Sequence, residues 1–234
     1  MAKILNIETS TEICSVSISE DGNCKFLKIY IPDSESAEKF SHSKLLAVFI
    51  DEILKENQIL PSQIDAVAVS GGPGSYTGLR IGVSSAKGFA FGIGKPLIAV
   101  DSMHIIAKMA KTKTGDNFEY FIPMTDARRM EVYCSVFDKS LRQISPVEAK
   151  IITEDSFEEY EQYKTCFCGN GAEKCISILQ NQNFSFAKNI FPSAEYMGEF
   201  SEQKYNNKDF ADLAYYEPYY LKDFVATTPK NKII

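Results

Sequence analysis

The stretch Asp65-Ala66-Val67-Ala68-Val69-Ser70-Gly71-Gly72-Pro73-Gly74-Ser75-Tyr76-Thr77-Gly78 decides the fold of this chain. Its short apolar run predicts a buried strand, and the glycines that follow predict a tight turn into a helix over Thr77–Phe91. A strand, a glycine turn and a helix in this order place backbone N–H groups where they stabilise an anion. The order is typical of α/β proteins that bind phosphate.

The glycine block also differs from a nucleotide-binding P-loop. No Gly-Lys-Ser or Gly-Lys-Thr closes it, and Arg80 is the cation nearby. Glycines equally serve turns with positive φ and the close packing of a strand on a helix. The block alone therefore supports phosphate binding and a purely architectural role about equally.

The helix after the block carries one surface of small side chains. A glycine inside a helix costs about 0.5–1 kcal/mol relative to alanine, so several of them predict the close approach of another backbone. That backbone belongs either to this chain's own sheet or to another subunit, packed beside a second helix over residues 41–57. The small residues are Gly78, Gly82, Ser84, Ser85, Ala86, Gly88, Ala90 and Gly92.

Three antiparallel strands are predicted at the N-terminus, before the glycine block. The first ends at Glu8-Thr9-Ser10-Thr11, where a nucleotide-binding hairpin would offer a carboxylate to a metal and hydroxyls to a phosphate. Taken alone, these residues are better explained as a polar hairpin turn. The helix over residues 41–57 has an apolar stripe made of Leu45, Leu46, Phe49, Ile50, Ile53 and Leu54.

The second half of the chain is expected to form a second lobe. Strands are predicted over residues 97–100, 118–124, 131–137 and 165–168, and helices from Ser102, over 153–163 and over 196–205. Gly169-Asn170-Gly171-Ala172 is predicted to lead into another helix. Because 234 residues suit two small lobes that share a cleft, we expect lobes over residues 1–100 and 101–234, the last helix packing back on the first lobe.

Composition and the N-terminal sequence indicate a cytoplasmic protein. Met1-Ala2-Lys3 precedes too short an apolar segment for a signal peptide, and charges interrupt the most apolar window, so no membrane contact is expected. The six cysteines then indicate reduced thiols, with Cys166-Phe167-Cys168 buried in a strand and not bound to zinc. A net charge of −6 indicates that any contact with nucleic acid is indirect or local.

The two histidines limit metal-dependent chemistry. His42 lies at the start of a predicted helix, where it is expected to cap the helix or face solvent, and His104 is expected to be half-buried. Neither has a second histidine or a carboxylate at the spacing of a metal site. No Gly-x-Ser-x-Gly elbow marks a nucleophile. We therefore expect no metal site and no catalytic residue.

These motifs, in this order, resemble the TsaB (YeaZ) family over nearly the whole chain. The resemblance rests most on the highly specific block Gly72-Pro73-Gly74-Ser75-Tyr76-Thr77-Gly78-Leu79-Arg80-Ile81-Gly82 and on Asp126-Ala127-Arg128, whereas Pro218-Tyr219-Tyr220-Leu221-Lys222 matches loosely. It implies an α/β, two-lobed actin-like ATPase fold of the sugar kinase, Hsp70, actin and ribonuclease H-like class. It also implies a role in installing the threonylcarbamoyl group on the adenosine beside the anticodon of certain tRNAs.

The resemblance further implies that chains of this family and TsaD have different roles. Such chains are inactive relatives of TsaD, the subunit that transfers threonylcarbamoyl to tRNA, and they act with TsaD and the small ATPase TsaE. TsaD-like chains carry an H-x-x-x-H metal pair, with which the lone His104 is out of register. Glu8 and Lys222 depart from the family's Asp and Arg but keep the charge. The chain is therefore expected to be a non-catalytic scaffold that dimerises with TsaD, reaches tRNA through the complex and self-associates without TsaD.

Two sets of residues are expected to carry this role. No cofactor is expected to bind tightly, and ATP or ADP would bind only in the complex. The nucleotide-like cleft would consist of Glu8, Thr9, Ser10, Gly72, Gly74, Ser75, Gly169 and Gly171. The partner interface would consist of His42, Leu46, Phe49, Ile50, Ile53, Arg80, Gly82, Ser85 and Phe89, and Leu46→Asp or Gly82→Leu would break it.

Two other functions fit parts of the sequence. An ATP-dependent small-molecule kinase or transferase of the same fold would explain the glycine turn and Glu8, but the catalytic carboxylate–metal constellation is missing. A glycoprotease-like peptidase would need a nucleophile or a zinc pair, and the sequence offers neither. Tight binding and turnover of ATP with magnesium would favour the kinase.

Overall fold

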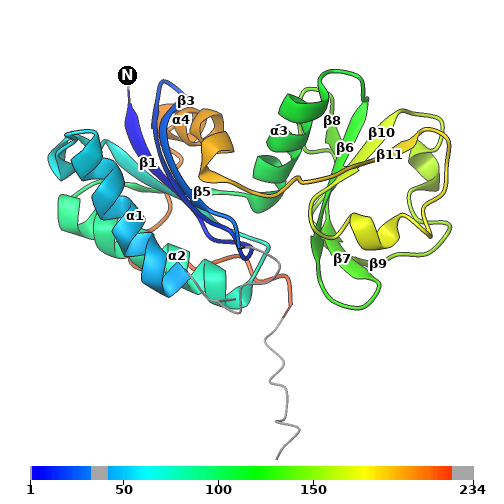
Figure 1. The fold of residues 1–234 in the computed structure, drawn as a ribbon, viewed down its shortest axis with the longest axis horizontal. Helices are drawn as coiled ribbons and strands as arrows, with labels where there is room; N and C mark the ends of the chain where they lie inside the picture. The colour runs from blue at the N-terminus through cyan, green and yellow to red at the C-terminus, as the bar shows by residue number, and fades with distance from the viewer. Residues whose placement is uncertain (1, 33–41, 223–234) are drawn as a thin grey trace, which may run out of the picture.

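The computed structural model describes residues 2–32 and 42–222, which form two lobes, each built around one β-sheet (Figure 1). Residues 33–41, which include the first residue of the helix predicted over 41–57, and the tail after residue 222 lie outside the described part.

The first lobe contains a five-stranded sheet in the order β3-β2-β1-β4-β5. β1 pairs antiparallel with β2, and β2 with β3, which confirms the predicted N-terminal strands. β4 runs parallel to β1, and β5 runs parallel to β4. The strands are β1 (Lys3–Glu8), β2 (Cys14–Glu20), β3 (Asn23–Tyr30), β4 (Ala66–Ser70) and β5 (Leu97–Val100).

The second lobe repeats this plan. Its sheet has the order β11-β10-β6-β7-β9, and β8 pairs with β6. β6, β7 and β9 are antiparallel neighbours, whereas β10 and β11 run parallel to β6. The strands are β6 (Tyr120–Asp126), β7 (Glu131–Cys134), β8 (Phe137–Asp138), β9 (Glu148–Ile151), β10 (Thr165–Cys168) and β11 (Phe184–Ala187).

Four α-helices cover the sheets in the described part of the chain (Figure 1). α1 (His42–Glu56) and α2 (Tyr76–Ile93) pack together on one face of the first sheet, against β2 and β4. α4 (Gly198–Asn206) packs on the same sheet, against β5 and β1. α3 (Ser102–Thr114) follows β5 and packs on β6 and β10 of the second lobe. None of these helices is long and apolar enough to cross a membrane.

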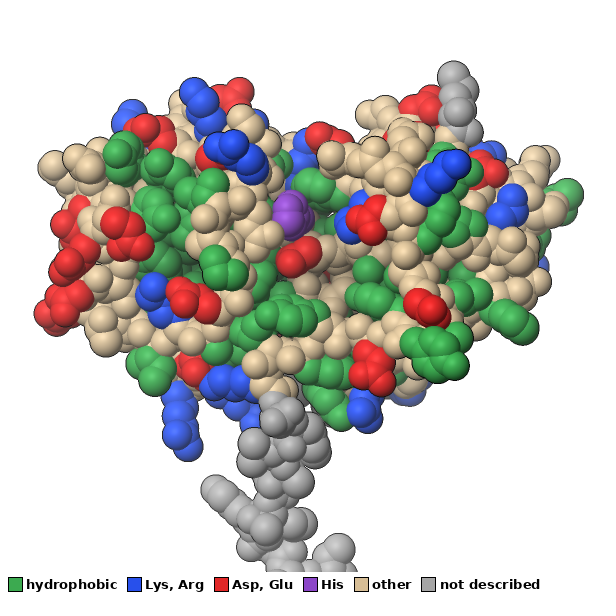
Figure 2. Space-filling model, turned by 180° about the vertical axis from the view of Figure 1, so that it is seen from behind, with side chains coloured by type: hydrophobic (Ala, Val, Ile, Leu, Met, Phe, Trp, Pro, Cys, Tyr) green, Lys and Arg blue, Asp and Glu red, His purple; other side chains and the backbone are tan. Residues whose placement is uncertain are grey.

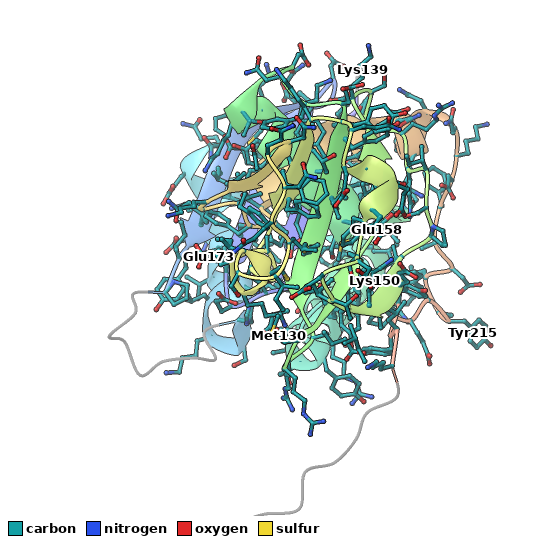
Figure 3. The ribbon with its side chains drawn as sticks, turned by 90° about the vertical axis from the view of Figure 1, so that its right-hand side faces the viewer. Met130, Lys139, Lys150, Glu158, Glu173 and Tyr215 are labelled. Atoms are coloured by element: carbon teal, nitrogen blue, oxygen red, sulfur yellow. The ribbon has the colours of Figure 1, made fainter. Side chains whose placement is uncertain are left out.

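Two predicted helices of the second lobe are wrong. Residues 153–163 contain only a single 3-10 turn, Glu158–Tyr160, and the segment after Gly171 contains only the turn Glu173–Cys175; Figure 3 labels Glu158 and Glu173. The first helix fails because Phe157 has φ 71°, a left-handed conformation that interrupts a right-handed helix. This backbone conformation accompanies burial of the Phe157 ring, 5.4 Å from the ring of Phe167. Tertiary packing therefore overrides the local pattern.

The buried state predicted for the thiols of β10 is confirmed. Cys166 and Cys168 are fully buried and unbonded to another sulfur, and burial raises the pKa of the Cys168 thiol above its ordinary range. These thiols act as small apolar side chains in the core of the second lobe.

Candidate functional site

The glycine block and the β1–β2 turn are pressed directly together. A Cβ atom on Gly74 would lie 2.3 Å from the Ser10 carbonyl oxygen, and one on Gly78 would lie 2.1 Å from that of Thr9. Hydrogen bonds join the same surfaces: the Ser75 N–H donates to the Ser10 carbonyl (2.6 Å) and the Thr9 hydroxyl to the Gly78 carbonyl (2.8 Å). These glycines therefore permit close packing of the glycine block on the β1–β2 turn.

Gly71 and Gly72 face a different neighbour, the segment 210–222, which we call the C-terminal strap. A Cβ on Gly71 would lie 2.4 Å from the Tyr216 hydroxyl, and one on Gly72 would lie 2.8 Å from the Tyr219 carbonyl oxygen. The Tyr219 N–H donates to the Gly71 carbonyl (2.8 Å). The first two glycines of the block thus allow the C-terminal strap to pack closely against it.

The C-terminal strap also connects helix α2 to the second lobe. Lys87 on α2 donates to the carbonyls of Ala214 (2.9 Å) and Tyr216 (3.1 Å). The Arg80 guanidinium lies 4.2 Å from the centre of the Tyr76 ring, which itself packs on Tyr220 of the strap. At the far end, Lys222 pairs with Glu131 of β7. The loosely matching C-terminal motif thus contacts both lobes.

Glu8 is fully buried where β1 meets the glycine block. Its Oε1 accepts the Ser10 N–H (2.5 Å), while Oε2 has no hydrogen-bond partner among residues 2–32 and 42–222. Burial raises the pKa of Glu8 to about 7, and the hydrogen bonds from Ser10 and Ser70 oppose that rise. The carboxyl group therefore titrates closer to neutral pH than an exposed glutamate does. Within the described residues, no group of three His, Cys, Asp or Glu side chains could hold a metal ion.

Gly169 and Gly171 lie in the second lobe and support the β6–β7 turn, whose end is marked by Met130 in Figure 3. A Cβ on either glycine would lie within 3 Å of the Met124 or Thr125 backbone. Asn170 between them accepts the Asp126 N–H through Oδ1 (3.0 Å). The motifs around Asp126 and Gly169 therefore form one packed unit.

The structure thus divides the predicted cleft residues among separate contacts. It brings Glu8, Thr9 and Ser10 together with Gly74 and Ser75, whereas Gly72 faces the strap and the two second-lobe glycines support a turn. For the glycines of the block, the architectural role has direct support. Nucleotide binding by these residues stays a prediction.

Several residues predicted at the partner interface lie in this chain's own core. His42 is buried, with Nε2 3.1 Å from the Ile13 carbonyl oxygen, so its expected capping or surface role is wrong. A Cβ on Gly82 would lie 2.1 Å from the Thr9 hydroxyl. Leu46→Asp and Gly82→Leu would therefore disturb folding and would not test an interface. The apolar stripe packs its own sheet through Leu46, Ile50, Ile53 and Leu54.

The accessible face of α1 and α2 combines two glycines of the predicted small-residue surface, Gly88 and Gly92, with two apolar residues that no sequence pattern had indicated. Val48 and Phe91 are 46% and 78% exposed. No atom lies within 4 Å of a Cβ placed on Gly88 or Gly92, so packing within the described chain does not account for these helical glycines. We call the surface formed by Val48, Gly88, Phe91 and Gly92 the α1–α2 outer face. From the predicted interface, Arg80 is exposed and Phe49, Ser85 and Phe89 are partly buried.

Comparisons with known proteins agree with this architecture. The family model described as "TsaD: tRNA N6-adenosine threonylcarbamoyltransferase" matches residues 35–229. The "tRNA threonylcarbamoyladenosine biosynthesis protein TsaB" of Haemophilus influenzae is 31% identical over 95% of this chain and 94% of that protein. The Escherichia coli protein of the same name is 27% identical over 96% of each chain.

A solved structure establishes the fold independently. "YeaZ from Pseudomonas aeruginosa" superimposes with a TM-score of 0.81 at 23% identity, covering 94% of this chain and all of that one. Together with the repeated sheet plan, this confirms the α/β, two-lobed actin-like ATPase fold. The chain belongs to the TsaB family of tRNA threonylcarbamoyladenosine biosynthesis proteins.

Proposed function

We propose that this chain is a non-catalytic subunit that binds a TsaD-type transferase through the α1–α2 outer face. The observation that carries the proposal is the pair Gly88 and Gly92, one helical turn apart, where no atom of the described residues requires a glycine. A glycine at each position costs about 0.5–1 kcal/mol relative to alanine. A second backbone packed against this face would explain why glycine is used there.

The transferase is related to this chain in sequence. The tRNA N6-adenosine threonylcarbamoyltransferase of Staphylococcus haemolyticus is 37% identical over 44% of this chain and 34% of that protein. Two chains with related folds can pair equivalent helices about a pseudo-twofold axis, as identical subunits do about a true one. The exposed Phe91 ring beside Gly88 would supply buried apolar area at the centre of the contact.

The remaining roles follow from this pairing. The chain would reach tRNA through the complex, in the cytoplasm, with TsaE as a third component. A nucleotide would bind only once the complex has formed. Without the transferase, the same apolar face would pair with a second copy of this chain.

Gly88→Leu tests the surface. We expect it to weaken binding to the transferase at least about tenfold, or 1.4 kcal/mol, because a leucine side chain would hold the two backbones apart. Its own fold should persist, since the position faces open space. Binding is measured by calorimetry with the purified transferase, and tRNA modification by reconstitution with every other component supplied.

Thr112→Leu, at an exposed position on α3, is the matched control and should bind as the parent does. Unchanged binding by a folded Gly88→Leu variant would place the interface elsewhere. Turnover of ATP by the isolated chain would favour the kinase function instead.

A further inference from the structure

The turn between β6 and β7 on the second lobe presents two arginines in an unfavourable backbone conformation. Arg128 and Arg129 have φ values of 72° and 51°, in the left-handed region. Glycine or asparagine normally supplies such residues in tight hairpin turns, because other side chains are strained there. Residues held in strained conformations gather at binding sites. The backbone conformation therefore does not explain why arginine is used at both positions.

Both guanidinium groups are available to a ligand. Arg128 and Arg129 are exposed, and within the described residues neither side chain has a hydrogen bond or an ion pair. The carboxylate of Asp126, at the base of the same turn, already pairs with Lys174. The positive charges of the two arginines are therefore not neutralised by this neighbour.

Several hydrogen bonds hold the turn that carries these arginines. The Lys174 ammonium donates to the carbonyls of Arg129 (2.7 Å) and Glu131 (2.6 Å) as well as to the Asp126 carboxylate. From the other side, Asn170 accepts the Asp126 N–H (3.0 Å). A turn that is already ordered loses little conformational entropy when its side chains bind a ligand, which favours binding.

The turn is continuous with a basic and aromatic surface on the first lobe. The C-terminal strap reaches the turn through the pair between Lys222 and Glu131, and two residues earlier Tyr220 packs on Tyr76 at 4.9 Å between ring centres. Arg80 donates through Nε to the Tyr220 hydroxyl (3.3 Å), and a guanidinium has further N–H donors for another partner. We call the set Tyr76, Arg80, Tyr220, Lys222, Arg128 and Arg129 the basic–aromatic row.

The basic–aromatic row is a local exception on an acidic protein. The whole chain has a net charge of −6. Beside the row, lysines neutralise Asp126 and Glu131, and Glu217 lies near Arg80, so a positive excess remains. Figure 2 shows Lys and Arg side chains along the lower rim of the molecule and mixed charges over the rest of that face. A basic strip on an otherwise acidic surface directs a polyanion to that strip, because the remaining surface repels it.

We propose that the basic–aromatic row binds the phosphodiester backbone of RNA, with Arg80, Arg128 and Arg129 on phosphates and the Tyr220 ring against an unstacked base. Guanidinium groups bind phosphate oxygens through paired N–H groups. Aromatic rings interleaved with them are typical of RNA-binding surfaces, whereas a surface for acidic peptides does not need the rings. The choice of tRNA as the RNA rests on the proposed function. Within the complex, this chain then contacts tRNA directly.

The test measures binding of the full-length chain to a fluorescently labelled tRNA transcript by anisotropy, at salt concentrations from about 50 to 200 mM. We expect the parent to bind with a dissociation constant of about 10–100 µM at the lowest salt, and to bind more weakly as salt rises. The double variant Arg128→Gln/Arg129→Gln should bind at least about tenfold more weakly. The slope of log affinity against log salt should fall by about 1.5, because two phosphate contacts are lost.

The double variant Lys25→Gln/Lys208→Gln is the matched control. It removes the same charge from two exposed positions outside the basic–aromatic row, and it should bind tRNA within about twofold of the parent. Equal losses of affinity in the two double variants would overturn the proposal, because net charge and not the row would then bind RNA. Absence of saturable tRNA binding by the parent up to about 0.3 mM chain would overturn it as well.

Two further measurements separate this proposal from the partner surface and from another class of ligand. The Arg128→Gln/Arg129→Gln variant should bind the purified transferase as the parent does, whereas Gly88→Leu should lose the transferase and keep the tRNA affinity of the isolated chain. Loss of transferase binding in the double variant would place the turn in the protein interface and contradict the proposal. Displacement of tRNA by polyglutamate as readily as by unlabelled tRNA would assign the row to acidic proteins and also overturn it. Should the double variant fail to fold, Arg80→Gln on the other lobe decides, with an expected loss of tRNA affinity of at least about threefold.

Discussion

Gly78→Ala is expected to destabilise the folded chain by about 3 kcal/mol or more, although it adds a single methyl group to a helix. The methyl carbon would lie 2.1 Å from the Thr9 carbonyl oxygen, well inside contact distance. That carbonyl belongs to the β1–β2 turn, which is itself held by hydrogen bonds to the glycine block. Relief of the clash therefore requires the turn and the helix to separate.

Gly88→Ala on the same helix is the matched control, and it should have the opposite sign. A Cβ there meets no atom within 4 Å among the described residues. In the monomeric chain, measured below the concentration of self-association, only the helix propensity changes, and a gain of about 0.5–1 kcal/mol is expected. Urea denaturation of both variants and the parent gives the two free energies. Equal effects of the two substitutions would mean that the contact between Gly78 and Thr9 does not hold the fold.

The stability of Glu8→Gln relative to the parent is expected to rise by about 3 kcal/mol between pH 4.5 and pH 8. Burial raises the pKa of the carboxyl from its ordinary value of 4.5 to about 7. Between these two values the folded chain binds more protons than the unfolded chain, so the parent protein loses stability as the pH rises through that window. Glutamine carries no charge to desolvate, and its carbonyl can still accept the Ser10 N–H.

The measurement compares urea denaturation of the parent and of Glu8→Gln across pH 4.5 to 8. Asp101, with its raised pKa, adds a dependence of the same sign, and His104, with its lowered pKa, adds the opposite one. Both groups are present in the two proteins, so they cancel in the difference. A difference in stability that stays constant with pH would show that burial does not raise the pKa of Glu8.

Local patterns predicted most of the first lobe correctly. Alternating residues indicated the N-terminal strands. The apolar stripe predicted α1 and the glycine turn predicted α2, both almost to their ends. The same spacing misled the search for a partner surface, because a regular apolar stripe marks the face that packs on the chain's own sheet. Leu46 and Ile53 are therefore core residues. The accessible residues Val48 and Phe91 follow no periodic pattern, so no sequence signal could have found them.

The sequence alone determined the family, the order of strands and helices in the first lobe and the position of the glycine block, because these depend on neighbouring residues. Only the tertiary structure decided what each glycine does. Gly72 allows the C-terminal strap to pack closely, Gly78 does the same for the β1–β2 turn, and Gly88 contacts no neighbour among the described residues. It also decided the protonation of Glu8 and joined residues as distant as Glu131 and Lys222. Burial and close contact depend on segments far apart in the chain, and no local pattern records which segments meet.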